Sequence, residues 1–306
     1  MCFQSVYGIM RRLGRKYFRL PYNRKKSKLF FELQTPKLPI EHRLADSEQF
    51  GLAIATMVFN EASYLKEWID FHIYQGVERI FLYDHQSTDN TFDVLQPYIR
   101  NGTVQYIFWP NFFGSAAQIF ALSHSLHLAQ EYRWLMQIDL DEFMFSVDGY
   151  PLPQVLKQYE NNHGLKVSWR NFGTSGHKIR PHGFVTLNYT KSFTDLTYPN
   201  LRNEHYAFFK FKSIVNPRSV LVNDVHEPLT PTPLIDISHQ VYCNHYVTKS
   251  EAEFEIKLSK LSGFVPRPKV HAAKRRKLKE FLDENSVEDQ YILKAVPRYF
   301  LSTERA

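Results

Sequence analysis

Hydrophobic and polar positions alternate along the middle of the chain in blocks that predict strands and helices in turn. Residues 52–58 (LAIATMV) are almost continuously apolar, as in a parallel strand that is covered on both faces. From Leu65 to Ile73 apolar side chains recur at spacings of three and four, which predicts one buried helix face. Gly76 predicts the end of that helix, and residues 79–83 form the next predicted strand.

The same alternation continues toward residue 140. The pattern predicts a helix that ends near Pro97 and then a strand over 103–108. A further helix is predicted over 115–131 and a last strand over 134–138. Strands that alternate with helices in this way imply an open, twisted, mostly parallel sheet with right-handed crossovers and flanking helices. The predicted fold class is therefore α/β.

The pattern is weaker beyond residue 150. Further strands are expected over 164–169 and 208–215, and a strand-like stretch over 219–222. Helices are expected over 251–262 and 271–284, and a glycine-containing link over 171–177 is expected to be irregular.

Polar side chains follow three of the predicted strands. Asn60 and Glu61 follow the first, residues 84–89 follow the second, and residues 139–142 follow the fourth. Ligands of open α/β sheets bind beyond the carboxyl ends of the strands, so these groups are expected to line one site.

Three carboxylates stand within four positions at the last of these strand ends. Asp139 and Asp141 are two residues apart and are expected on the same side of an extended backbone. Two hard oxygen ligands suit Mg²⁺ or Mn²⁺, which would bridge a diphosphate and take up charge as it leaves. The alternative is an acidic turn after a core strand. Glu142 is left open between support of the other two and simple exposure to solvent.

Composition narrows the classes of protein. The 43% apolar content supports a sizeable core, and two cysteines, Cys2 and Cys243, exclude a disulfide framework. Neither a dinucleotide-binding glycine motif nor a P-loop motif is found. No run of about 18 apolar residues predicts a membrane span, and the N-terminus lacks the apolar segment of a secretory signal.

The net charge of +7 is concentrated in the first 28 residues and in 269–279. Basic segments interleaved with aromatic residues suit anionic lipid or nucleic acid, and a solvated arm is the alternative. A nucleic-acid binder would leave the strand-end carboxylates unexplained, so no nucleic-acid partner is expected. We expect a cytoplasmic protein whose basic arm makes peripheral contact with the inner face of a membrane.

Several short motifs follow one another over residues 50–265. They include Val58-Phe59-Asn60-Glu61, Tyr83-Asp84-x-x-Ser87-Thr88-Asp89, Asp139-x-Asp141-Glu142-Phe143, Lys212-Ser213-Ile214-Val215 and Asn244-His245-Tyr246-x-x-Lys249-Ser250. In this order they resemble the GT-A glycosyltransferases, and more narrowly the family 92 and family 2-like branch. The resemblance implies a Rossmann-like domain with an irregular acceptor-side half. The expected parts are a basic arm and linker, the GT-A domain and a basic helical tail, over residues 1–48, 49–265 and 266–306.

The resemblance also implies the reaction and its ligands. A sugar would pass from a nucleotide diphosphate, expected to be a UDP-sugar, to a hydroxyl of a glycan or glycolipid acceptor, with inversion. Asp139 and Asp141 would hold Mn²⁺ or Mg²⁺. A later histidine would complete the coordination, with His226 as first choice and His245 as second. The residues expected to bind the nucleotide sugar are Asn60, Glu61, Asp84, Asp89, Gly173, Ser175 and Gly176.

Some roles stay open at this stage. An inverting transfer needs a carboxylate base, for which Glu227 and Glu204 are both candidates. The polar run 84–89 also suits helix N-capping, which is compatible with ligand binding. A nucleotidyltransferase is a second possible enzyme class, although it would ordinarily carry a glycine-rich basic loop after the first strand. A non-catalytic glycan- or lipid-binding protein is a third, against which the intact pair Asp139 and Asp141 argues.

Overall fold

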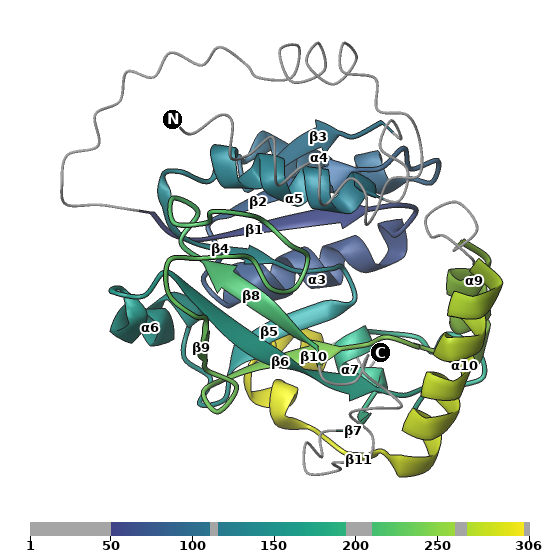
Figure 1. The fold of residues 1–306 in the computed structure, drawn as a ribbon. Coiled ribbons are helices and arrows are strands. Elements are labelled where there is room, and N and C mark those ends of the chain that lie inside the picture. Colours follow the sequence, from purple (N-terminus) through teal and green to yellow (C-terminus); the bar gives the residue numbers. More distant parts are fainter. Residues whose placement is uncertain (1–49, 111–115, 194–209, 261–267, 303–306) are drawn as a thin grey trace. The chain divides into compact units, whose positions relative to one another are not determined.

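The first half of the folded unit alternates strand and helix, as the hydrophobic pattern predicts (Figure 1). The computed structural model describes residues 50–110, 116–193, 210–260 and 268–302. Contacts group residues 49–306 into one unit, and the predicted boundary at residue 265 stays a prediction. The alternating elements are β1 (Phe50–Val58), α3 (Ala62–Tyr74), β2 (Arg79–Asp84), α4 (Thr91–Arg100), β3 (Val104–Phe108), α5 (Ala117–Leu128) and β4 (Tyr132–Gln137).

The predicted end of a helix at Pro97 is wrong. Helix α4 continues through Pro97 to Arg100. Pro97 has no N–H to donate to the backbone carbonyl four residues earlier. Because the proline lies on the exposed side of the helix, that carbonyl can face water instead.

The parallel part of the sheet has the order β3-β2-β1-β4. Helices α3 and α4 contact each other on one face. The crossover from β3 through α5 to β4 runs in the opposite direction across the sheet from the crossovers before it. A right-handed crossover in this direction places α5 on the other face. The described structure therefore confirms the predicted α/β class and its mostly parallel core.

Antiparallel strands extend the sheet beyond β4. Strand β8 (Phe211–Val215) pairs antiparallel with β4, and β6 (Gly164–Phe172) pairs antiparallel with β8. The predicted irregular link thus begins only after Phe172, because residues 171 and 172 still belong to β6. No regular strand forms over 219–222, where Val222 makes only an isolated bridge to Leu229.

A smaller group of strands brings distant residues to the edge where β4 ends. Strand β10 (Val241–His245) pairs antiparallel with β5 (Glu142–Ser146) and parallel with β6. In this register His245 lies opposite both Glu142 and Asn171. The other elements are α6 (Leu152–Leu156), η2 (Lys157–Tyr159), α7 (Val185–Asn188), β7 (Lys191–Phe193), β9 (Ile235–Asp236), α9 (Glu251–Lys260), α10 (Pro268–Asn285), β11 (Val287–Glu288), η5 (Tyr291–Lys294) and α11 (Arg298–Ser302).

The core is apolar and continuous behind this edge. Leu52 and Ile54 of β1 are completely buried, as are Trp68 and Phe71 of α3. The Trp68 indole N–H donates to the backbone oxygen of Glu142 at 2.8 Å, which ties α3 to the start of β5.

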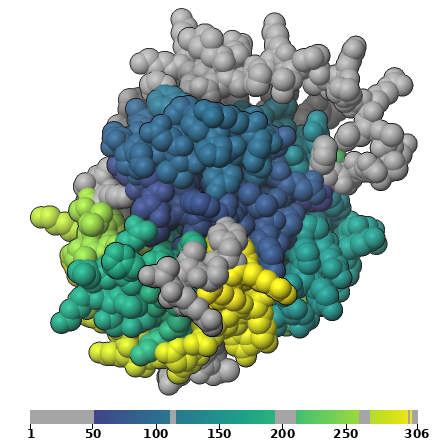
Figure 2. All heavy atoms as spheres, turned by 180° about the vertical axis from the view of Figure 1, so that it is seen from behind, coloured from purple at the N-terminus to yellow at the C-terminus, as the bar shows by residue number. Residues whose placement is uncertain are grey.

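Seen from behind, early and late segments of the unit lie side by side (Figure 2). The side-chain amide of Gln75, just after α3, donates from Nε2 to the backbone oxygen of Ala295 at 2.7 Å. Within the described ranges, none of the helices has the length and apolarity that a membrane crossing requires.

Candidate functional site

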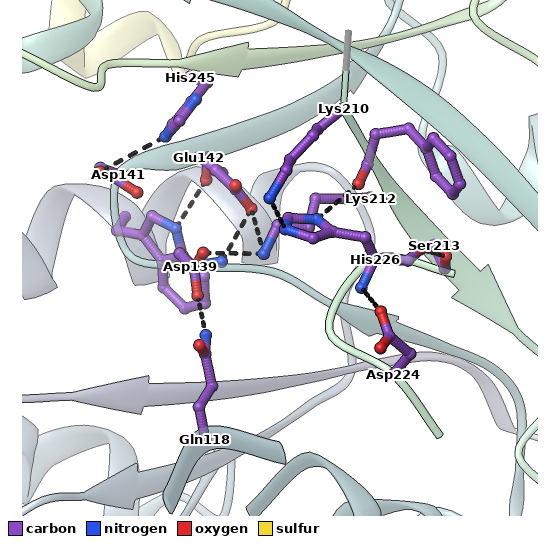
Figure 3. Close-up of polar contacts among 12 residues, drawn as sticks. Gln118, Asp139, Asp141, Glu142, Lys210, Lys212, Ser213, Asp224, His226 and His245 are labelled. Atoms are coloured by element: carbon purple, nitrogen blue, oxygen red, sulfur yellow. Dashed lines mark hydrogen bonds and ion pairs between the residues drawn. The ribbon is translucent and has the colours of Figure 1, made fainter. Parts of the chain in front are cut away.

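The carboxylate cluster lies in a tight turn between β4 and β5. The amide of Glu142 donates to the backbone oxygen of Asp139 at 3.1 Å, which closes the turn. The backbone is therefore not extended here, and the expectation that Asp139 and Asp141 project to one side of a strand is wrong. The two side chains instead face different sets of partners (Figure 3).

Asp139 is held by a lysine and an amide. Lys212 of β8 is completely buried, and its ammonium lies 2.8 Å from Asp139 Oδ2 and 3.4 Å from Glu142 Oε2. Gln118 of α5 donates to Asp139 Oδ1 at 2.6 Å. Burial opposes the charge of Lys212, but Asp139 and Glu142 outweigh it, so the pKa of Lys212 lies above its usual value. A permanent cation thus already neutralises this side of the cluster.

Asp141 faces the later part of the chain. Its Oδ2 accepts a hydrogen bond from Lys257 of α9 and lies 3.7 Å from His245 Nε2. Burial opposes ionisation of Asp141, but the Lys257 ammonium beside it holds its pKa well below the usual value. Asp141 is therefore an ionised carboxylate at neutral pH.

Three side chains at this point can hold a metal ion. Asp141, Glu142 and His245 each offer one ligand atom, and these atoms lie within 4.8 Å of one another. Glu142 Oε1 is buried without a hydrogen-bond partner in the described part of the chain. A buried, unsatisfied carboxylate oxygen is costly unless a cation or donor completes it. The three groups therefore fit a divalent cation.

The tautomer of His245 suits this role. Its Nδ1 donates to Asn171 Oδ1 at 2.9 Å, which leaves the Nε2 lone pair directed toward Asp141. Burial lowers the pKa of His245, so the imidazole is neutral at physiological pH.

His226, the first choice from the sequence, lies outside this group of three. Its Nε2 accepts from Lys210 Nζ at 3.2 Å, and its Nδ1 donates to the backbone oxygen of Phe211 at 3.1 Å. Burial and the nearby Lys212 and Lys210 lower the pKa of His226 to about 4. Both ring nitrogens are thus engaged by the protein.

The two candidate bases are not brought to the cluster by any described contact. Glu227 is exposed on the loop after His226, where its amide donates to Asp224 Oδ1 at 3.2 Å. Glu204 lies outside the described residues.

The polar groups after β1 and β2 form one hydrogen-bonded network. Asn60 has a positive φ of 53°, and its Oδ1 accepts from the amide of Thr88 at 2.7 Å. Asp84 is buried and accepts from the Tyr106 hydroxyl at 2.7 Å. Asp89 accepts from the amides of Ala62 and Thr91, each at 3.1 Å, at the starts of α3 and α4. Capping is therefore one role of Asp89, as the sequence allowed.

The glycine-containing loop after β6 is anchored to α10. The Thr174 amide and hydroxyl donate to Asp283 at 2.7 and 2.8 Å. A Cβ at Gly173 would lie 2.8 Å from that carboxylate, so any other residue there would have to displace the Asp283 side chain. Ser175 and Gly176 both have positive φ, and the Ser175 hydroxyl accepts from the amide of Lys191 at 3.0 Å. The loop follows β6 next to the strand that carries His245.

Comparison with known families shows to which family the chain belongs. The model of glycosyltransferase family 92 matches residues 48–282. The chain belongs to glycosyltransferase family 92. A family 92 protein of Ricinus communis is 33% identical over 195 residues, which cover 61% of this chain and 33% of the relative. A rice relative is 30% identical over 202 residues, which cover 63% and 32%. The chain thus spans about a third of the length of these relatives.

Solved structures show more remote likeness. S. aureus TarS in complex with UDP has a TM-score of 0.40 and 14% identity, covering 77% of this chain and 71% of that one. Glucosyl-3-phosphoglycerate synthase of Mycobacterium tuberculosis, with Mn²⁺, UDP and glucosyl-3-phosphoglycerate, has a TM-score of 0.33 and 14% identity, covering 55% and 57%. Likeness at this level says nothing of the ligands of the family 92 chain.

Three site residues of this family 92 chain had no assigned role from the sequence. They are Gln118, Lys212 and Lys257. Lys212 carried a usable signal, since a lysine within the apolar strand run Phe211–Val215 needs a buried counter-charge. Gln118 and Lys257 lie on helices with no pattern that points to the carboxylates.

Proposed function

We propose that the chain is a metal-dependent glycosyltransferase that moves a sugar from a UDP-sugar to a hydroxyl of a glycan or glycolipid, with inversion. The observation that carries the proposal is the buried Glu142 Oε1, which has no hydrogen-bond partner among the described residues and lies beside Asp141 and His245. Membership of family 92 supports the sugar-transfer chemistry. The nucleotide and the acceptor class come from the motif resemblance.

In this proposal Asp141, Glu142 and His245 hold Mn²⁺ or Mg²⁺, so that Glu142 and His245 take the places first given to Asp139 and His226. The bound ion supplies a Lewis acid that takes up negative charge on the departing diphosphate. The Lys212 ammonium, 2.8 Å from Asp139 Oδ2 and 3.4 Å from Glu142 Oε2, would balance part of the negative charge of the cluster.

The edge formed by the ends of β1 and β2 would bind the nucleoside. Asn60, Glu61, Asp84 and Asp89 are the residues proposed to shape it. Gly173, Ser175 and Gly176, in the loop after β6, are proposed to shape the sugar and acceptor side. Glu227 and Glu204 remain the proposed alternatives for the base.

A donor assay tests the proposal. UDP-sugars are screened for Mn²⁺-dependent thermal stabilisation and for hydrolysis, with Asp141→Asn as the test variant. Asp93→Asn, an exposed carboxylate on α4, is the matched control. Loss of a metal ligand is expected to reduce hydrolysis at least about 100-fold, while the control keeps the parent rate. The proposal is wrong if no nucleotide sugar shifts the melting curve or if Asp141→Asn responds like the parent.

A further inference from the structure

Lys249 is a third lysine close to the site, and its ammonium differs from those of Lys212 and Lys257. Each of the other two donates a hydrogen bond to a carboxylate of the cluster. Lys249 is only 12% exposed, and its Nζ lies 3.6 Å from Glu61 Oε2, beyond hydrogen-bonding distance. Within the described ranges, none of the three ammonium donors of Lys249 has a hydrogen-bond acceptor.

The neighbour that covers Lys249 is an aromatic ring. The ammonium lies 3.2 Å from the ring centroid of Tyr64 on α3. A cation–π contact partly offsets the loss of water but does not satisfy N–H donors. The side chain is thus held against Tyr64, and its N–H donors make no hydrogen bond to the protein within the described residues.

The backbone at Lys249 is also in an unusual conformation. Its φ is +53°, in the left-handed region that costs a residue with a Cβ about 1–2 kcal/mol relative to glycine. The residue lies between β10 and α9, and glycine would relieve this cost. Backbone strain that a simple substitution would remove is a common feature of ligand sites.

The position of Lys249 links the two halves of the proposed donor site. Glu61 follows β1 at the edge proposed for the nucleoside. Burial lowers the pKa of Lys249, and the carboxylates that act against this are first Glu61 and then Asp141 of the metal cluster. Lys249 follows β10, the strand that ends at His245, and its ammonium lies 3.6 Å from Glu61, so it is next to both parts of the proposed donor site.

We propose that Lys249 is a donor-binding residue whose ammonium donates hydrogen bonds to the diphosphate oxygens of the nucleotide sugar. The inference rests on the proposed function, because it assumes a nucleoside diphosphate beside Asp141. A phosphate oxygen would satisfy the open donors of Lys249. The Glu61 carboxylate would hold the ammonium in position before the donor binds.

The test separates phosphate binding from folding. Lys249→Gly removes the ammonium but favours the left-handed backbone, and Lys249→Met removes the charge but keeps the Cβ. Lys66→Met is the matched control, since Lys66 is on α3, 69% exposed and paired with Asp70. Uridine, UDP and inorganic pyrophosphate are titrated calorimetrically into the full chain with Mn²⁺, and melting temperatures are recorded.

Both Lys249 variants are expected to bind UDP and pyrophosphate at least about tenfold more weakly, with uridine affinity unchanged. Lys249→Gly should melt at or above the parent temperature, and Lys66→Met should match the parent throughout. If the parent prefers UDP over uridine and Lys249→Gly keeps that preference, this inference alone is overturned. A parent that binds UDP no more tightly than uridine overturns the proposed function together with it.

Discussion

Each aspartate of the cluster is paired with a different lysine, so the site has two sides. Lys212 neutralises Asp139 from β8, and Lys257 contacts Asp141 from α9. The two aspartates therefore have different environments although only one residue separates them. On the Asp139 side a buried lysine already acts as the cation, whereas on the Asp141 side a histidine and an unsatisfied glutamate oxygen are available.

Substitution of each histidine in turn tests which of the two is a metal ligand. His245→Ala is expected to weaken Mn²⁺ binding about 10–100-fold, because it removes a proposed ligand. His226→Ala should leave Mn²⁺ affinity within about twofold, since a lysine ammonium lies 3.2 Å from that ring. Electron paramagnetic resonance of free Mn²⁺ measures both affinities. The opposite ranking of the two variants would show that His226 is the ligand.

The sequence identified the carboxylates but not their surroundings. Asp139 and Asp141 stood out because three acids follow an apolar strand, which is a local signal. The selection of His245 depends on the pairing of β10 with β5, which joins residues about 100 positions apart. The sequence near the cluster predicts neither the turn at Asp139 nor the contact with Lys257.

Among the elements, those with local periodicity were predicted best. The β1–β4 alternation follows from runs of apolar residues and helical spacing, so its strands and helices lie close to the expected positions, apart from the end of α4. The later strands depend on long-range pairing, which sequence spacing does not encode. The stretch 219–222 is apolar enough for a strand, yet it forms only one bridge.

Helix α3 contains a buried histidine that makes folding depend on pH. His72 is completely buried, donates from Nδ1 to the Trp68 backbone oxygen at 2.8 Å and accepts at Nε2 from the Met144 amide at 3.3 Å. Burial lowers its pKa from 6.5 to about 3. Because the folded pKa is the lower one, the stability from neutral His72 is complete above pH 6.5 and falls as the pH drops toward 3.

His72→Gln should remove this pH dependence. Between pH 7 and pH 5 the parent is expected to lose about 2 kcal/mol more stability than the variant. The reason is that pH 5 lies ~1.5 units below the usual pKa of histidine, and each unit costs about 1.4 kcal/mol. Urea unfolding at both pH values measures the difference. Equal losses in the two proteins would mean that His72 can be protonated in the folded state.

At the scale of the whole molecule, the basic arm is the part whose role remains a prediction. Residues 1–49 lie outside the described structure, so the expected membrane contact rests on the sequence alone. Deletion of residues 2–28 should abolish sedimentation with vesicles that contain phosphatidylserine, because each basic residue near such a surface contributes about 1 kcal/mol. Neutral vesicles are the control. Unchanged sedimentation after the deletion would exclude the arm as the membrane contact.

The central claim for the molecule is that Asp141, Glu142 and His245 hold a divalent ion that binds a nucleoside diphosphate. Calorimetric titration of UDP, in Mn²⁺ and then in EDTA, tests it with the parent and with Asp141→Asn. We expect chelation to weaken UDP binding to the parent at least about tenfold and to have no further effect on the variant. Equal UDP affinity of the parent in Mn²⁺ and in EDTA would contradict the account.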